Sequence, residues 1–424
     1  MRALLITAIF ACSCLNAATL TTIHAFSCTA EGIPSGALAI GETPDGHTAI
    51  YGATGQGGPD GYGMVYLLTP DSAGSWTSTT LHVFAGPDGI APAGGVVLGP
   101  GQVLYGTTRN GGGDKFGGTV FSLRPPAVPG GVWTEQVLHR FTGPPDDGAL
   151  PESLLAIGPG ADGRMSLYGT TTRGGASGGG TVFALTPPLS PGGDWQETVL
   201  YSFTKSGHQG YNPFSGVVLG PGSPKGPSLF GVTGFGGGGA GAVGSVYVLT
   251  PPTASEPWRF EVLYRFSPNG SGSSPGPIVT AGGAGAPFVL FGTTAEGSPT
   301  SSGTVYSLMP PATSGNPWIE SQLYEFIDRA DGAAPEGGVV AGADGTLYGT
   351  ASQGGPAGYG VVFSLTPPTS PDGQWKESTV YGFTGGADGA FPQAPIAVGK
   401  QGILYSTTSN GGDGLCGTVF SLKP

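Results

Sequence analysis

One short segment, Leu-Tyr-Gly-Thr-Thr and its close variants, recurs seven times at intervals of about 60 residues. Its aromatic residue is found at Tyr51, Tyr105, Tyr168, Phe230, Phe291, Tyr348 and Tyr405. All six tryptophans belong to the same repeat, and each is followed eight residues later by a phenylalanine: Trp76 and Phe84, Trp133 and Phe141, Trp195 and Phe203, Trp258 and Phe266, Trp318 and Phe326, and Trp375 and Phe383. Such a chain folds as an array of one supersecondary unit, because neighbouring copies bury each other's apolar faces.

Each unit contains four short segments in which apolar and polar residues alternate. In the segment 199–203, for example, Val199, Tyr201 and Phe203 fall on one face. A period of two residues between Gly- and Pro-rich turns is typical of β-strands and not of helices. Seven units of four strands predict an all-β protein, a seven-bladed β-propeller with four antiparallel strands per blade. A β-solenoid is the alternative, although its rungs are usually much shorter.

The composition supports a folded β protein, although the chain of 424 residues contains 83 Gly and 40 Pro. A disordered chain is charged and poor in aromatic residues. This chain is only 10% charged and has 20 Phe, 15 Tyr and 6 Trp, so Gly and Pro are interpreted as turn residues. The net charge of −12 and the lack of a basic run argue against binding to nucleic acid or to an anionic membrane surface.

The N-terminus predicts a secretory signal at residues 1–18. Arg2 precedes an apolar run at 3–11, and small residues follow at Ala17 and Ala18. A first buried strand and a lipid anchor near Cys12 are the alternatives. No apolar stretch is long enough to cross a membrane. Residues 19–424 are expected to form a single propeller domain with blades at approximately 29–84, 85–141, 142–203, 204–266, 267–326, 327–383 and 384–424 plus 19–28.

The order of strands within a unit predicts how the ring closes. From inside to outside, we expect the run Gly-Val-Val-Leu, then Leu-Tyr-Gly-Thr-Thr, then Gly-Thr-Val-Phe-Ser-Leu, then the segment from Trp to Phe. The last unit ends after its third strand, at 417–422. Residues 21–26 match an outer strand, so the N-terminal strand is predicted to complete the last blade.

The cysteines lead to a second prediction about closure. Cys12 and Cys14 lie in the signal region, which leaves Cys28 and Cys416. Cys28 follows the N-terminal strand and Cys416 precedes the third strand of the last blade. Antiparallel neighbours place these two positions side by side, so we expect a disulfide, as is usual in an exported protein. Two buried free thiols are the alternative.

These motifs resemble the GloVer repeat, the tandem repeat of the "choice-of-anchor" bacterial exported proteins. The units at Tyr105, Tyr168 and Tyr348 match best, while those at Phe230 and Tyr405 depart from the pattern. The resemblance covers nearly all of the chain after the signal. It implies an exported repeat protein, often tethered by a variable C-terminal anchor. The chain ends at 423–424 with no such tail, and the resemblance implies no activity for any residue.

The strongest polar candidates are the acids of an Asp-Gly-x-x-Pro turn: Asp88, Asp147, Asp331 and Asp388. The other units have Glu31, Gln209 and Ser271 at the equivalent position. These turns and the loops after the second strands are expected on one face of the ring. There the acids would surround the channel mouth and hold a cation such as Ca²⁺. Alternatively, each Asp caps its own turn by accepting a backbone hydrogen bond, an interpretation that the repetition favours.

The remaining candidates are fewer. His24, His82 and His139 fall in outer strands and are interpreted as ordinary sheet residues, and no zinc-binding motif is present. Polar residues that do not follow the repeat occur in the loops of units two to four, at Arg109, Asp114, Lys115, Arg173, Lys205, His208 and Tyr211. These residues are a further hypothesis for a binding site.

The sequence therefore favours a non-enzymatic binding or interaction module, in the periplasm or outside the cell, with a glycan or a cell-surface protein as its partner and a monomer as its state. One alternative is a carbohydrate-active hydrolase or lyase with its site on a propeller face. Another is a structural protein of the envelope or matrix. Fold alone does not choose among them. Clustering of non-repeating polar residues on one face would favour the first two, and scatter would favour the third.

Overall fold

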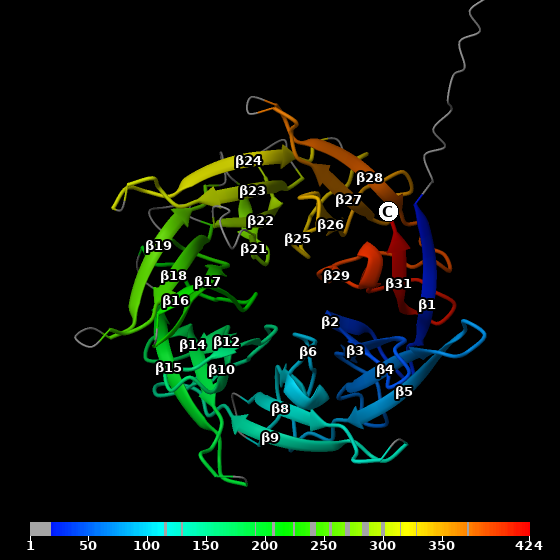
Figure 1. Ribbon diagram of the computed structural model, residues 1–424, viewed down its shortest axis with the longest axis horizontal. Coiled ribbons are helices and arrows are strands. Elements are labelled where there is room, and N and C mark those ends of the chain that lie inside the picture. The colour runs from blue at the N-terminus through cyan, green and yellow to red at the C-terminus, as the bar shows by residue number, and fades with distance from the viewer. Residues whose placement is uncertain are drawn as a thin grey trace, which may run out of the picture.

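Seven antiparallel sheets surround a central axis in the computed structural model, and each sheet is one blade (Figure 1). The seven-bladed β-propeller predicted from the repeat is therefore confirmed. The structure describes residues 18–113, 117–128, 130–190, 192–205, 208–223, 225–237, 243–253, 257–267, 272–281, 288–297, 302–313, 315–327, 329–370 and 373–424. The predicted signal lies almost entirely outside these residues, as do Cys12, Cys14, Asp114, Lys115 and Ser271.

The first four blades have their strands in chain order from the axis outward. Blade 1 contains β2 (Pro34–Glu42), β3 (Thr48–Thr54), β4 (Met64–Pro70) and β5 (Trp76–Val83). Blade 2 contains β6 (Val96–Leu98), β7 (Leu104–Thr108), β8 (Thr119–Arg124) and β9 (Thr134–Arg140). Blade 3 contains β11 (Ala156–Pro159), β12 (Met165–Thr171), β14 (Gly178–Thr186) and β15 (Gln196–Thr204). Blade 4 contains β16 (Val217–Ser223), β17 (Gly226–Thr233), β18 (Ser245–Thr250) and β19 (Arg259–Arg265).

The last three blades follow the same plan with two changes. Blade 5 has an additional short strand, and the outer strand of blade 7 comes from the N-terminus. Blade 5 contains β21 (Val279–Ala281), β22 (Val289–Glu296), β23 (Thr304–Met309) and β24 (Ile319–Glu325), and β20 (Ser273–Pro275) also pairs with β22. Blade 6 contains β25 (Val339–Ala341), β26 (Leu347–Ala351), β27 (Val361–Thr366) and β28 (Lys376–Gly382). Blade 7 contains β29 (Ala397–Val398), β30 (Leu404–Thr408), β31 (Leu415–Lys423) and β1 (Thr19–Ser27).

Short additional elements complete the described chain. Two-residue strands β10 (Gly148–Ala149) and β13 (Arg173–Gly174) pair with each other beside blade 3. The 3-10 helices η1 (Pro100–Gln102) and η2 (Lys400–Gly402) connect inner strands to second strands. Within the described ranges, no helix has the length and apolar character needed to cross a bilayer.

The ring closes as the sequence predicts, because the N-terminal strand is the outer strand of the last blade. Strand β1 pairs antiparallel with β31, from Thr19 opposite Lys423 to Ser27 opposite Leu415, and Figure 1 shows the two side by side. This register brings Cys28 and Cys416 together in a disulfide with a Cα–Cα distance of 5.1 Å. The predicted pairing of these cysteines is confirmed, and the bond indicates an oxidising compartment.

The core consists of seven apolar clusters, one at each interface between neighbouring blades. In every interface, the Phe that ends an outer strand packs against an aromatic ring of the third strand of the next blade, with ring centroids 5.0 to 5.3 Å apart. These pairs are Phe26–Tyr66, Phe84–Phe121, Phe141–Phe183, Phe203–Tyr247, Phe266–Tyr306, Phe326–Phe363 and Phe383–Phe420. The repeated Trp-to-Phe segment is thus the element that joins blades.

The glycine of the Leu-Tyr-Gly-Thr-Thr segment leaves room for these rings. A Cβ atom on Gly169 would lie 2.5 Å from the ring of Phe183, and one on Gly349 would lie 2.4 Å from the ring of Phe363. Real side chains do not approach so closely, so glycine is required by packing at these positions. Blade 7 departs from the pattern with Ser406, whose buried hydroxyl donates to the carbonyls of Ala394 and Pro395.

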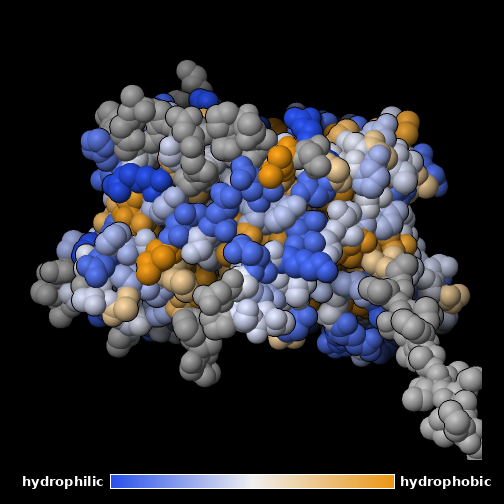
Figure 2. Space-filling model, turned by 90° about the horizontal axis from the view of Figure 1, so that it is seen from above, coloured by the Kyte–Doolittle hydropathy of each residue, from blue (hydrophilic) through white to orange (hydrophobic). Residues whose placement is uncertain are grey.

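The outer edge of the ring is a mixed surface. Figure 2 views the molecule at right angles to Figure 1 and shows hydrophobic residues scattered among hydrophilic ones on the side that faces the viewer. The exposed strands β5, β9 and β15 alternate exposed and partly buried residues, which is the period-two pattern read from the sequence.

Candidate functional site

The four predicted aspartates lie at the outer rim, where each binds the outer strand that precedes it. Asp88 accepts from the backbone N–H of Ala85 at 2.8 Å, and its Oδ2 lies 2.8 Å from Nε2 of His82. Asp388 accepts from the hydroxyl of Tyr381 at 3.1 Å and from the backbone N–H of Thr384 at 2.8 Å.

Asp147 and Asp331 make the same type of contact, with His139 and with the hydroxyl of Tyr324. Glu31 takes this role in the closing blade, where it accepts from Ser27 N and lies 2.8 Å from Nε2 of His24. Each acid therefore caps its turn by accepting from backbone or side-chain groups that precede it in the chain. The binding of Ca²⁺ by these aspartates stays a prediction.

The partner of the turn acid is an aromatic residue two positions before the interface Phe. This position is occupied by His24, His82, His139, Tyr201, Tyr264, Tyr324 and Tyr381. In all seven cases its ring packs edge-on against that Phe. The three histidines are more than ordinary sheet residues, because they hold the turn acid. The recurrence of His or Tyr two positions before the interface Phe was the signal in the sequence.

A second carboxylate approaches several of these acids from the next blade. It belongs to the residue two positions after the Trp, which is Glu135, Glu197, Glu320 or Glu377 in four of the blades. Burial, together with repulsion from Asp88, Asp147 and Asp331 respectively, raises the pKa of Glu135, Glu197 and Glu377 to about 7. Sequence reasoning missed these glutamates, because they come from a different repeat.

Asp147 shows how the two carboxylates of one interface differ. Burial by itself raises the pKa of Asp147, but hydrogen bonds from His139 and from the backbone of Thr142 outweigh burial, so the pKa lies below its usual value. Only 7% of Asp147 is exposed. At this interface Asp147 therefore carries the negative charge, and Glu197, which lies opposite, retains a proton more readily than Asp147 does.

We expect the variant Glu377→Gln to flatten the pH dependence of stability. The pKa of Glu377 is raised on folding, so this residue contributes stability that is present below about pH 4.5 and is lost as pH rises through about 7. Because Glu377 binds a single proton, its contribution to the free energy of unfolding changes by no more than about 1.4 kcal/mol per pH unit. Solvent around this partly exposed carboxyl reduces that change further. Urea unfolding at pH 5 and pH 8 measures the change. An equal loss of stability between the two pH values in the variant and the original protein would contradict the assignment.

The loops on one face of the ring differ between blades. We name this the turn face, which consists of the Asp-Gly-x-x-Pro turns and of the loops that follow the second strands. Bridges join the two sets of loops within a blade, as between Ile90 and Asn110 and between Ala390 and Asn410. The expectation that these turns and loops share one face is confirmed.

Of the loop residues singled out in units two to four that the structure describes, Arg109 and Tyr211 each form a pair. Arg109 forms an ion pair of 2.7 Å with Glu152, which lies in the turn leading into blade 3. The ring of Tyr211 stacks on Phe235 at 5.6 Å, and Phe235 is 52% exposed. Arg173, Lys205 and His208 are exposed and lie outside both pairs.

Two positions of each repeat vary on the turn face. The residue after the turn proline is Ser35, Ala93, Glu152, Phe214, Gly276, Glu336 or Gln393. The residue after the Leu-Tyr-Gly-Thr-Thr segment is Gly55, Arg109, Thr172, Gly234, Ala295, Ser352 or Ser409. Residues at the first of these two positions, or shortly after it in the chain, line a cavity of about 340 Å³ on the propeller axis that is formed by all seven blades.

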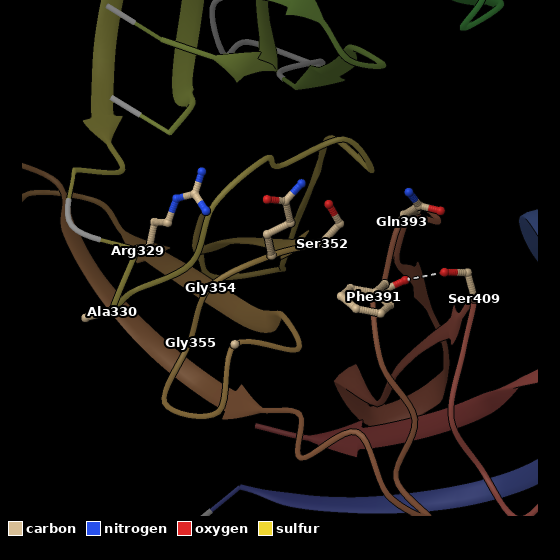
Figure 3. Close-up of a pocket in the computed structure, with 10 residues that line it drawn as sticks. Arg329, Ala330, Ser352, Gly354, Gly355, Phe391, Gln393 and Ser409 are labelled. Carbon is tan, nitrogen blue, oxygen red and sulfur yellow. Dashed lines mark hydrogen bonds between the residues drawn. The ribbon is translucent and has the colours of Figure 1, made fainter. Parts of the chain in front are cut away.

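A larger cavity of about 620 Å³ opens between the loops of blades 6 and 7. Arg329, Ser352 and Gln353 line one side, and Gln393 and Ser409 line the other (Figure 3). The hydroxyl of Ser409 donates to the carbonyl of Phe391 at 3.1 Å, which holds the second side together. Arg329 and Phe391 have φ angles of 65° and 55°, in the left-handed region. Sequence reasoning missed this cavity, because no single motif contains its residues.

The chain is similar to several solved structures at low sequence identity. An uncharacterised protein from Dyadobacter fermentans DSM 18053 is 11% identical, covers 86% of this chain and 98% of its own, and has a TM-score of 0.45. The soluble aldose sugar dehydrogenase of Escherichia coli is 12% identical, with coverage of 96% and 99% and a TM-score of 0.43. The α-L-arabinanase of Penicillium chrysogenum is 12% identical, with coverage of 94% and 98% and a TM-score of 0.42. No curated protein sequence matches the chain.

The family comparison agrees with the repeat seen in the sequence and in the blades. The model of the Gloeobacter/Verrucomicrobia repeat matches residues 7–226 and again residues 223–424. Together the two matches span almost the whole chain. The protein therefore belongs to the Gloeobacter/Verrucomicrobia (GloVer) repeat family.

Proposed function

We propose that this protein is an exported, non-enzymatic binding module that takes a glycan in the cavity between blades 6 and 7. The observation that carries the proposal is the cavity of about 620 Å³ whose polar lining comes mainly from positions at which the blades differ. A residue required only for the ring would follow the repeat, as the interface Phe residues do. Side chains that break the repeat and gather at one cavity are typical of a ligand site.

The chemistry of the lining favours a sugar. The carboxamides of Gln353 and Gln393 each offer a donor and an acceptor, as do the hydroxyls of Ser352 and Ser409. Such groups match the alternating donors and acceptors of neighbouring sugar hydroxyls, and the guanidinium of Arg329 offers two donors side by side. Export is supported by the Cys28–Cys416 disulfide and by the apolar N-terminus.

The experiment is a binding screen of residues 19–424 against immobilised oligosaccharides and polysaccharides, followed by calorimetry with the glycan that binds. We expect Gln353→Ala and Gln393→Ala each to weaken binding by about three- to tenfold, since a typical hydrogen bond contributes about 0.5–1.5 kcal/mol. The matched control is Gln56→Ala, because Gln56 is the exposed residue at the position of Gln353 in blade 1. Equal weakening by Gln56→Ala would contradict the assignment of this cavity.

Two other outcomes would redirect the proposal. Cleavage of the bound glycan during incubation would favour the carbohydrate-active hydrolase or lyase. A screen in which no glycan binds would contradict the glycan proposal and leave a surface-protein partner or a structural role in the envelope.

A further inference from the structure

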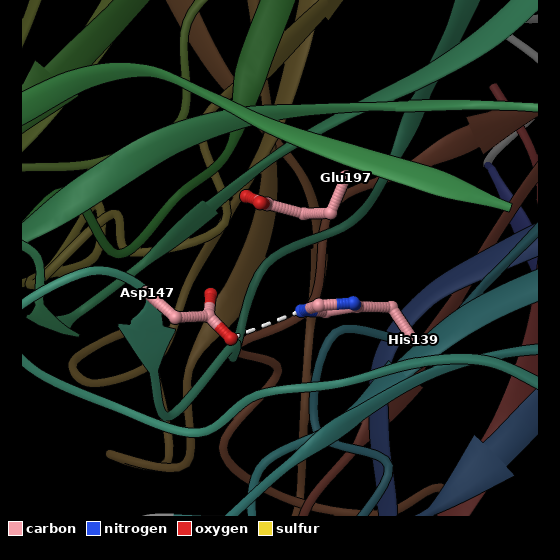
Figure 4. Close-up of side chains that lie close together, drawn as sticks. All are labelled: His139, Asp147 and Glu197. Carbon is pink, nitrogen blue, oxygen red and sulfur yellow. Dashed lines mark hydrogen bonds and ion pairs between the residues drawn. The ribbon is translucent and has the colours of Figure 1, made fainter.

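The interface between blades 2 and 3 contains three side chains with metal-binding atoms. His139 comes from β9, Asp147 from the turn that follows β9, and Glu197 from β15 of the next blade (Figure 4). One ligand atom from each lies within 4.8 Å of the other two. The distance from His139 Nε2 to Asp147 Oδ2 is 3.1 Å.

Two of the three side chains are held in place by other parts of the fold. Asp147 accepts from the backbone N–H of Thr142 at 2.9 Å and from that of Gly148 at 2.6 Å. The imidazole of His139 packs edge-on against Phe141 at 4.7 Å. A ligand set that is already oriented loses little conformational freedom when an ion binds.

Glu197 contributes an oxygen that has no partner. Its Oε1 atom is inaccessible to solvent and accepts no hydrogen bond among the described residues. A buried carboxylate oxygen without a partner costs free energy, and one oxygen of this carboxylate lies within 4.8 Å of ligand atoms of Asp147 and His139. A cation bound between the three groups would satisfy this oxygen and remove the repulsion between Glu197 and Asp147.

The geometry points to a Zn²⁺ site formed by His139, Asp147 and Glu197, with a fourth position left for water. Zinc bonds of about 2.0–2.2 Å in a tetrahedron place neighbouring ligand atoms about 3.3 Å apart, near the distance between His139 and Asp147. A nitrogen ligand favours zinc over Ca²⁺, which takes oxygen ligands. This site differs from the ring of aspartates considered from the sequence, because it uses one Asp together with residues of two outer strands.

The interface between blades 1 and 2 has the same three residue types, His82, Asp88 and Glu135. Among the described residues, however, the ligand atoms of three such groups lie within 4.8 Å of one another at His139, Asp147 and Glu197.

Two further interfaces lack part of the set. Between blades 5 and 6, Tyr324 donates to Asp331, while Glu377 approaches from the next blade. A tyrosine there satisfies the aspartate and supplies no imidazole nitrogen. In the closing interface, His24 binds Glu31, but Ser78 stands at the position equivalent to Glu197. Only part of the ligand set is present at each of these two places.

These natural differences provide the variants for a test with Zn²⁺ alone as the probe. His139→Tyr copies the residue of blade 5 and retains a donor for Asp147, but it removes the nitrogen ligand. Glu197→Gln retains the shape of the side chain and removes the charge. His24→Tyr is the matched control, since it makes the same exchange where Ser78 takes the place of the third ligand.

The experiment is calorimetric titration of ZnCl₂ into residues 19–424 after treatment with EDTA and removal of any histidine tag. We expect one equivalent of Zn²⁺ to bind and to raise the melting temperature by mass action. His139→Tyr and Glu197→Gln should each weaken binding at least tenfold, while His24→Tyr binds as the original protein does. Melting in EDTA reports whether each variant folds.

The proposal is overturned if the original protein binds no Zn²⁺ in this titration. It is also overturned if His139→Tyr and Glu197→Gln, both folded in EDTA, bind Zn²⁺ as tightly as the original protein. Loss of binding in His24→Tyr would likewise place the ion elsewhere.

Discussion

Replacing Cys28 and Cys416 with serine is expected to lower the free energy of unfolding by about 2–5 kcal/mol. The bond joins the end of β1 to the start of β31, two neighbouring strands of blade 7 that lie at opposite ends of the sequence. The two cysteines are separated by 388 residues. A chain-entropy model gives about 6 kcal/mol for a loop of this size, and residual structure in the unfolded chain reduces that value. Without the bond, the pairing of β1 with β31 and the apolar cluster between blades 7 and 1, which includes Ile23 and Phe26, keep the ring closed.

Urea unfolding of the original protein and of the serine variants measures this effect. The single variant Cys28→Ser should lose as much stability as the double variant, because the two residues act through one bond. Reduction of the original protein should reproduce the loss. Equal stability of the oxidised and reduced protein would contradict the role of the disulfide in closing the ring.

Truncation of an interface phenylalanine is expected to have an effect of similar size. Phe326 is fully buried, and its ring lies 5.1 Å from Phe363 of the next blade and 5.1 Å from Tyr324. Phe326→Ala removes these contacts and leaves a cavity between two sheets that cannot close without moving a blade. Such substitutions cost about 3–5 kcal/mol.

The neighbouring residue supplies the control for this prediction. Ile327 is 63% exposed, so Ile327→Ala should change stability by no more than about 0.5 kcal/mol. Thermal and urea unfolding of both variants provide the comparison. Similar stability of Phe326→Ala and Ile327→Ala would show that the aromatic pairs between blades do not carry the packing energy assigned to them.

The predicted function depends on the turn face more than on the blades. The interface residues follow the repeat because every blade must bury the same surface, and they carry little information about a ligand. The polar residues lining the cavity of blades 6 and 7 come from positions that vary around the ring, although Gln56 of blade 1 matches Gln353. Their variation is the reason to test ligand binding there first.

Local patterns in the sequence were sufficient for the architecture. Alternation with a period of two residues identified the strands, and seven copies identified the blades. The absence of an outer strand in the last copy, together with the match of residues 21–26 to such a strand, predicted the closure. The disulfide between Cys28 and Cys416 was then predicted from the antiparallel pairing of the two strands, because such pairing fixes the neighbours of each residue along the ladder.

Only the tertiary structure decided which side chains of different blades meet. Glu197 reaches Asp147 because two twisted sheets pack face to face, and no local pattern encodes the distance between a strand of one repeat and the turn of another. The large cavity likewise depends on how the loops around Arg329 and Phe391 turn in the left-handed region of backbone space. Strands and their order are set by short-range periodicity, whereas sites between blades are set by the relative positions of packed sheets.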